Sequence, residues 1–313
     1  MSASPVEPDA PFERNAQMLA IDIGGTKMAA AVVSATGAVL WQTRLPTPPG
    51  GDSDTLWATV VSLLDSVPGE FAPVACGVGS GGPMSPAGES VSPLNIPGWR
   101  DFPLRKRIAD FTGLRTWVDN DAKALALAES WVGIAAGRRD FIAMVVSTGV
   151  GGGVVLDGRL LDGATGNAGH IGHVVVEPEG RRCECGGRGC LEAEASGTAI
   201  AATTGAPPNE AGAEVISRSG RLVGRAVASV ANLLDLRLAV VSGSVALGFG
   251  APFFQAAQEE IDERARLPFS RGCAIEPSEL GAEGPLIGAA AVGWRGLRPE
   301  LSGAPASPGE TCS

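Results

Sequence analysis

The stretch QMLAIDIGGTKMAAAVVSATGAVL, residues 17–40, decides the fold of this 313-residue chain. It consists of an apolar strand, a Gly-Gly turn and a second apolar strand, and a loop then leads to a third strand. A similar unit, FIAMVVSTGVGGGVVLDGRLL, returns at residues 141–161, with Thr148 at a place comparable to that of Asp22. This repetition predicts a duplicated α/β architecture, with one unit in each of two lobes and a cleft between the two turns.

Both turns have the composition of a phosphate-binding loop. Glycines let bare backbone N–H groups and a neighbouring hydroxyl approach an anion closely. The residues concerned are Gly24, Gly25, Thr26 and Lys27 in the first turn, and Thr148, Gly149, Gly151 and Gly152 in the second. Either loop alone would equally suit a tight hairpin. The presence of both favours phosphate binding, although no G-x-x-x-x-G-K-[ST] motif of a P-loop occurs.

A second glycine motif does not indicate a nucleotide site. Gly77, Gly79 and Gly82 spell G-x-G-x-x-G after a short apolar strand. In a dinucleotide-binding fold a helix would follow directly, but Pro83 and Pro86 follow here. We therefore reject the dinucleotide-binding interpretation.

The stretch TWVDNDAKALALAESWVG, residues 116–133, predicts a short strand that runs into a helix, with Asp121 at the junction. An aspartate at this position often caps the helix N-terminus, which contributes about 1 kcal/mol. A carboxylate that projects from a strand end into a cleft can also act as general base toward a substrate hydroxyl. The residues alone leave both roles open for Asp121.

Residues 221–248 predict an amphipathic helix, a buried strand and a small-residue turn at Gly243 and Ser244. The turn suits a place beside a nucleotide or ordinary α/β packing. The apolar face of the helix is expected to carry Leu222, Val223, Ala226, Val227, Val230, Leu233 and Leu234.

Both histidines and three of the six cysteines lie within residues 169–192, GHIGHVVVEPEGRRCECGGRGCLE. His173, Cys183, Cys185 and Cys190 form an H-x9-C-x-C-x4-C pattern. One imidazole and three thiolates are a closed tetrahedral ligand set, so the pattern predicts a structural zinc. The metal would also fix the ring of His173 and leave its second nitrogen as a directed N–H donor.

Composition limits the classes of function. A formal net charge of −10 argues against a nucleic-acid surface, which needs a positive field. No apolar run approaches the ~20 residues of a membrane span, and the N-terminus lacks the apolar core of a signal peptide. Clustered cysteines favour metal binding in a reducing compartment, so we expect a cytoplasmic protein without membrane partners. The two ends, residues 1–16 and 299–313, are expected to be disordered.

Four segments together carry a resemblance to the ROK family of bacterial sugar kinases and sugar-responsive repressors. They are DIGGTK (22–27), NDA (120–122), STGVGGG (147–153), and AGHIGH with CECGGRGCLE (168–173 and 183–192). The resemblance runs from about Gln17 to Leu297, and its zinc motif is the most specific part. It implies the two-lobed, actin-like ATPase fold of sugar kinases, with ATP and Mg²⁺ as phosphate donor and a hexose 6-hydroxyl as acceptor.

The family pattern also implies boundaries and roles. A small lobe is expected over 17–120, a large lobe over 121–284 with the zinc loop at 173–192, and a helix over 285–298 that returns to the small lobe. By position the resemblance implies Asp121 as the base, Asp22 near the metal, and sugar contacts from Asn95, Asn120, His173 and Glu192. The phosphates are expected beside Gly24, Gly25, Thr26, Lys27, Thr148 and Gly149, with Gly243 and Ser244 near the nucleotide.

His170 departs from the glucokinases of the family, which usually carry Glu at this place. A neutral histidine offers one donor and one acceptor, so it suits the carbonyl oxygen of an acetamido group better than two adjacent hydroxyls. The segment is similar to that of the bacterial N-acetylmannosamine kinases. N-acetylmannosamine is therefore slightly favoured as the substrate, and glucose remains the alternative.

Two other classes of function were weighed. The family's repressors place a DNA-binding domain of about 60 residues before the kinase-like body, and 21 residues precede Asp22 here. A sugar sensor without turnover would lack Asp121 or an intact phosphate loop, and both are present. A sugar kinase is thus expected, and members of the family often form homodimers.

Overall fold

The structure is a computed structural model that describes residues 15–298. Of the ends expected to be disordered, 1–16 and 299–313, residues 1–14 and 299–313 lie outside the described residues. Two five-stranded sheets form its frame, in the orders β3-β2-β1-β4-β5 and β8-β7-β6-β9-β10. The first contains β1 (Gln17–Ile23), β2 (Lys27–Ser34), β3 (Val39–Pro46), β4 (Ala75–Ser80) and β5 (Thr116–Asn120). The second contains β6 (Phe141–Val146), β7 (Val150–Leu156), β8 (Arg159–Leu160), β9 (Leu238–Ser242) and β10 (Ala274–Pro277).

The two sheets repeat one connection pattern. In each sheet the first strand along the chain lies in the centre, antiparallel to the second strand and parallel to the fourth. The third strand occupies one edge and the fifth the other. The duplicated architecture predicted from residues 17–40 and 141–161 is therefore confirmed.

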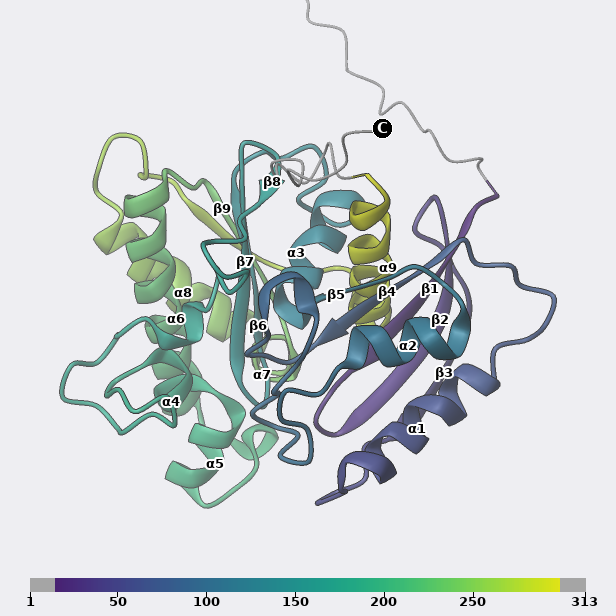
Figure 1. Cartoon of the computed structure of the whole chain (residues 1–313). Helices are drawn as coiled ribbons and strands as arrows, with labels where there is room; N and C mark the ends of the chain where they lie inside the picture. Colours follow the sequence, from purple (N-terminus) through teal and green to yellow (C-terminus); the bar gives the residue numbers. More distant parts are fainter. Residues whose placement is uncertain (1–14, 299–313) are drawn as a thin grey trace, which may run out of the picture.

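Helices cover both outer faces and fill the space between the sheets (Figure 1). The helices are α1 (Ser53–Asp65), α2 (Leu104–Thr112), α3 (Asp121–Trp131), α4 (Leu191–Ala195), α5 (Gly197–Thr204), α6 (Ala213–Leu234), α7 (Ser244–Phe249), α8 (Ala251–Arg264) and α9 (Gly284–Leu297). Figure 1 shows α1 and α2 beside the first sheet, α6 and α8 beyond the second, and α3 with α9 between them.

Buried clusters define these layers. Leu286 and Ala289 of α9 pack with Met18 of β1, whereas Leu125 of α3 packs with Phe141 of β6. Helix α9, at the C-terminal end of the described chain, thus returns to the first sheet. The largest cluster joins the second sheet to α6 and α8. Because α3 follows β5 directly and packs on the second sheet, the β5–α3 junction lies where the two halves meet.

The strand before the G-x-G-x-x-G motif runs further than expected. Strand β4 covers Ala75–Ser80 and so includes Gly77 and Gly79, while Val74 remains outside it and 48% exposed. A Cβ on Gly77 would overlap the backbone of α9 at Ala289 and Gly293. The absent side chain therefore allows close packing of a helix on the sheet, which agrees with the rejection of a dinucleotide site.

Helix α6 buries most of the apolar face that was predicted for it, but the prediction was wrong for Leu233. Leu222, Val223, Ala226 and Val227 are buried. Leu233 is 79% exposed, whereas Val230 and Leu234 at the same end of the helix pack partly buried against the core of the second sheet. Among the helices of residues 15–298, no helix has the length and apolar composition needed to cross a bilayer.

Gly77→Ala should lower the thermal midpoint of unfolding by several degrees. The added methyl group overlaps the backbone of α9, and such overpacking typically costs about 1–3 kcal/mol. Gly69→Ala is the matched control, since a Cβ there would have no atom within 4 Å. Equal midpoints for the two variants, measured by differential scanning calorimetry, would contradict the close packing of α9 on β4.

Candidate functional site

The junction of β5 and α3 presents Asn120 and Asp121 side by side. The Asn120 side chain caps the helix, since its Oδ1 accepts the N–H groups of Ala122 at 3.1 Å and Lys123 at 3.3 Å. This leaves the amide Nδ2 free to donate elsewhere. The capping role considered for Asp121 thus falls mainly to its neighbour, and Asp121 is the first residue of the helix.

Asp121 combines exposure with desolvation. Its side chain is accessible to solvent, yet burial among the surrounding protein groups raises the pKa of its carboxyl group above the ordinary value. The N–H of Ala122 and the nearby His170 oppose that rise. A carboxylate that is exposed and yet desolvated by neighbouring protein groups can be reached by a ligand, and a pKa raised in this way is common at functional sites.

Asp22, near the end of β1, provides a second carboxylate close to Asp121. A Cβ on Gly79 would lie 3.8 Å from Asp22 Oδ1 and 3.7 Å from Asp121 Cα, so the two aspartates flank the same point of β4. Burial, with the charge of Asp121 as the second cause, raises the pKa of Asp22 to about 7, and Lys27 opposes the rise. Two facing carboxylates of this kind are a site for a cation or a shared proton.

The turn between β1 and β2 is closed by its own backbone and by Asn95. Gly24 N–H donates to the Lys27 carbonyl at 3.0 Å, and Thr47 Oγ1 donates to the Gly24 carbonyl at 2.6 Å. A Cβ on Gly25 would lie 2.9 Å from Asn95 Nδ2, so glycine is required for Asn95 to lie over the turn. Thr26 and Lys27 remain exposed at its tip.

His170 lies beside Asn120. A Cβ on Gly82 would be 3.5 Å from Asn120 Nδ2 and 3.8 Å from His170 Cε1, which places both side chains over the same backbone. Burial, followed by the proximity of His173, lowers the pKa of His170 below the ordinary value. At neutral pH the ring is therefore uncharged, with one donor and one acceptor nitrogen.

The predicted metal ligands come together. The ligand atoms of His173, Cys183, Cys185 and Cys190 all lie within 4.8 Å of one another. His173 approaches Cys183 Sγ through Nδ1, at 3.7 Å, which leaves Nε2 available to a ligand. Cys183 and Cys190 are buried and Cys185 is exposed. This donor set fits a tetrahedral zinc, because thiolates and imidazole are the ligands that zinc prefers.

Glu192 connects the zinc loop to the second glycine turn. Its Oε2 accepts the N–H of Val150 at 2.8 Å and would lie 2.7 Å from a Cβ on Gly149. Thr148 lies exposed at the tip of the turn, and its carbonyl accepts the Thr198 hydroxyl at 2.9 Å. The start of α5 therefore holds the turn that was predicted to bind phosphate.

Ser147 is a residue of this region that the sequence analysis missed. Its Oγ and the Oγ of Ser244 lie 2.9 Å apart, so the turn after β6 and the turn after β9 are joined at equivalent ends of neighbouring strands. Gly243 and Ser244, in the turn after β9, thus lie beside the second glycine turn. The sequence signal that could have identified Ser147 is the occurrence of a serine after each of two apolar strands, Ser147 after β6 and Ser244 after β9.

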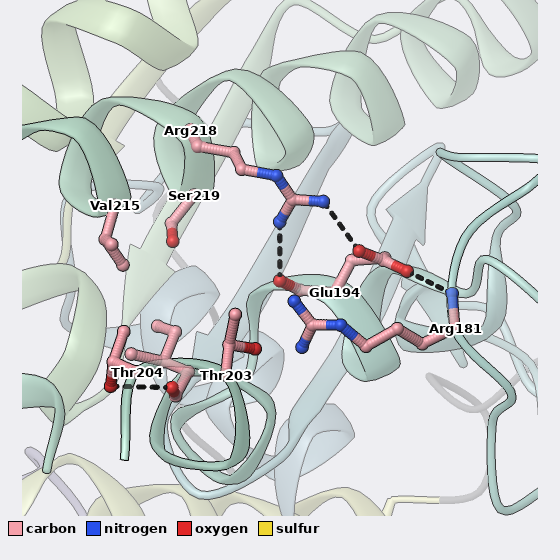
Figure 2. Close-up of a pocket in the computed structure, with 8 residues that line it drawn as sticks. Arg181, Glu194, Thr203, Thr204, Val215, Arg218 and Ser219 are labelled. Carbon is pink, nitrogen blue, oxygen red and sulfur yellow. Dashed lines mark hydrogen bonds and ion pairs between the residues drawn. The ribbon is translucent and has the colours of Figure 1, made fainter. Parts of the chain in front are cut away.

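A charged contact at Glu194 connects the zinc loop to α6 (Figure 2). Glu194 in α4 accepts the backbone N–H of Arg181 at 2.6 Å and the Arg218 guanidinium of α6 at 2.6 Å. A cavity of about 80 Å³ lies beside this contact. Because Cys190 and Glu192 flank the start of α4, the contact fixes the helix that carries them against α6.

The candidate residues therefore form a continuous series in which each residue interacts with the next. Electrostatic contacts lead from Lys27 to Asp22, Asp121 and His170, and from His170 on to Glu192 and His173. Hydrogen bonds then lead from Glu192 to the second glycine turn. The arrangement offers a desolvated carboxyl group, neutral polar groups beside it, and two glycine turns.

Comparisons with known proteins agree on one family. The ROK family description matches residues 18–294. An N-acetylmannosamine kinase of Citrobacter koseri is 40% identical over 250 residues, which cover 74% of this chain and 84% of that protein.

Solved structures show the same relationship. A ROK hexokinase of Thermus thermophilus has a TM-score of 0.77 at 31% identity, covering 90% of this chain and 99% of the other. A ROK glucokinase of Streptomyces griseus, in complex with glucose and AMPPNP, has a TM-score of 0.78 at 27% identity, covering 89% and 99%. The predicted actin-like kinase fold is thereby confirmed, and this chain belongs to the ROK family.

Proposed function

We propose that this chain is an ATP-dependent sugar kinase that phosphorylates the 6-hydroxyl of a hexose or N-acylhexosamine, with N-acetylmannosamine slightly favoured over glucose. The observation that carries the proposal is the accessible but desolvated carboxyl group of Asp121, between Asp22 on one side and Asn120 with His170 on the other. Such a group can take the proton of a sugar hydroxyl as that hydroxyl attacks a phosphoryl group.

The sugar would be held by the polar groups around that base. Asn120 has a free amide donor because its oxygen caps α3. His173 would donate from Nε2, Glu192 would accept through the oxygen that does not bind Val150, and Asn95 would close the site from the first turn. Orientation by several such groups is what turns a reactive carboxylate into an efficient base.

The ATP phosphates would lie between the two glycine turns, with Gly24, Gly25, Thr26 and Lys27 on one side and Thr148 and Gly149 on the other. Gly243 and Ser244 extend the second turn toward the nucleotide. Burial and, second to it, the charge of Asp121 raise the pKa of Asp22. This fits the binding of Mg²⁺, because a divalent cation would relieve the repulsion between the two carboxylates. When bound, Mg²⁺ neutralises charge on the transferred phosphoryl group.

The sugar preference rests on His170. The ring is uncharged at neutral pH and lies against Asn120, where it can donate one hydrogen bond to an acetamido carbonyl oxygen. The 40% identity to an N-acetylmannosamine kinase supports this substrate. The fold likeness to a glucokinase bound to glucose keeps glucose as the second candidate.

We also propose that zinc at His173, Cys183, Cys185 and Cys190 is structural, since all four positions are filled by protein atoms. A cluster of three cysteine thiolates suits a reducing compartment such as the cytoplasm.

Elemental analysis should find one zinc per chain, and Cys185→Ser should release it. Such sites contribute ~10 kcal/mol or more of coupled folding energy, so the 173–192 segment should exchange its amide hydrogens faster and turnover should fall. Cys273→Ser is the control, because Cys273 lies outside the cluster. A folded, active protein without zinc would overturn the assignment.

Asp121→Asn should lower kcat by at least about 10²-fold and change sugar affinity much less, because the amide keeps the shape but cannot take the proton. Thermal stability should change little, since Asn120 caps the helix. Asp110→Asn, at an exposed surface carboxylate, serves as the control. Full turnover together with a lower melting temperature would show that Asp121 has a structural role.

A coupled kinase assay over N-acetylmannosamine, glucose, mannose, N-acetylglucosamine and allose should give the highest kcat/KM for N-acetylmannosamine. His170→Glu should shift the ratio toward glucose, because a carboxylate accepts from two hydroxyls while the acetamido carbonyl loses its donor. An unpaired polar group costs about 1–3 kcal/mol, or roughly 5- to 150-fold. Identical ratios in both proteins would mean that His170 does not set specificity.

A further inference from the structure

Lys123 is a lysine that is almost completely buried in the first turn of α3, two positions after Asp121. Its side chain is 2% exposed. The ammonium group contacts three acceptors: Asp119 at 2.9 Å, Asp162 at 2.8 Å and the Gly166 carbonyl oxygen at 3.0 Å. Two hydrogen bonds and one ion pair therefore compensate the ammonium, as a buried charge requires.

Two of the three acceptors belong to the segment that leads into His170. The segment is closed on itself by the hydrogen bond from Ala168 N–H to the Asp162 carbonyl, at 2.9 Å. His170 follows Ala168 by two residues, and the intervening Gly169 packs tightly on Gly152 of β7. The 162–168 segment and β7 therefore approach His170 together from its N-terminal side and set where it lies relative to Asn120 and Asp121.

The third acceptor, Asp119, belongs to the frame. Its Oδ1 accepts the N–H of Asn120 at 2.8 Å, and its Oδ2 accepts Arg295 of α9 at 3.2 Å. Arg295 also pairs with Asp162. Two cations thus bridge the same two carboxylates, but Lys123 alone among them also binds Gly166 and comes from the helix that carries Asp121.

Close packing does not hold this segment where it meets the charged groups. A cavity of about 430 Å³ is lined by Ala164, Thr165 and Gly166 of the segment, by the 84–88 segment with Trp117, and by the four charged side chains Lys123, Asp119, Asp162 and Arg295. Asn167 Nδ2 reaches the Met84 carbonyl at 3.3 Å. Where packed atoms are missing, polar contacts decide the position of a segment.

We infer that Lys123 is a positioning residue for sugar recognition, which fixes the 162–168 segment and hence His170 at a set distance from Asn120 and Asp121. The inference rests on the proposed function, because it assigns His170 to the sugar. Lys123 touches no substrate in this account. It acts through the segment that it holds.

The two bridging cations should differ in effect when each is replaced by methionine. Lys123→Met removes the bond to Gly166 and separates the segment from α3, while Arg295 still bridges Asp119 and Asp162. Arg295→Met separates α9 from the same carboxylates but leaves the segment tied to α3. Both changes leave buried charge less well compensated, so both should destabilise the fold.

Lys123→Met should raise KM for the sugar about tenfold or more, with KM for ATP changed less than about twofold, as expected when a binding group is misplaced. Arg295→Met should lower the melting temperature to a similar degree with a much smaller rise in sugar KM. Hydrogen exchange of residues 162–170 should quicken in Lys123→Met more than in Arg295→Met. Asp162→Asn should raise sugar KM in the same direction and serves if Lys123→Met is poorly folded.

Sugar KM values that change together with melting temperature in both variants, or stay unchanged in Lys123→Met, would overturn the inference. So would equal exchange rates of residues 162–170 in the two variants, a readout that needs no sugar. If the native protein turned over none of the sugars, the proposed function would fail, while the exchange comparison would still decide whether Lys123 holds the segment.

Discussion

The cap that Asn120 forms on α3 is the interaction on which the rest of the site depends. By accepting two N–H groups of the first turn, Asn120 fixes where the helix starts and therefore where Asp121 and Lys123 lie. Helix α3 then lies between the two sheets, so its first turn is set by both halves of the molecule. One junction thus supplies an amide donor, a carboxylate and a buried cation from consecutive or nearly consecutive positions.

The strand–turn–strand units and the ligand set of the zinc loop could be predicted because each depends on local pattern. Apolar runs around Gly24 and Gly25, or the spacing of Cys183, Cys185 and Cys190, have the same meaning wherever the chain places them. The quartet of Lys123 with Asp119, Asp162 and Arg295 could not be predicted as a whole, since Asp162 and Arg295 lie far in the sequence from the other two. The local sign was a lysine among small apolar residues of a buried helix, four residues after an aspartate.

The raised pKa of Asp22 makes the stability of the folded protein depend on pH. Relative to the unfolded chain, the folded protein favours protonated Asp22, whose pKa is raised to about 7. Its contribution to stability is therefore complete below the ordinary pKa and is lost as the pH rises through about 7. Near neutrality part of the population carries two facing charges at Asp22 and Asp121. A cation bound between the two carboxylates would relieve their repulsion. Cation binding is therefore linked to the stability of the folded protein.

His170 and His173 lie three residues apart, with ring centroids 6.0 Å from each other, yet two unrelated constraints hold them. His173 belongs to the Cys₃ cluster, which α4 and the Glu194–Arg218 contact support from the side of α6. His170 follows the segment that Lys123 binds from the side of α3. The distance between the two rings therefore depends on both constraints together. A change in either one would therefore alter the shape of the wall that we propose to face the sugar, without replacing His170 or His173.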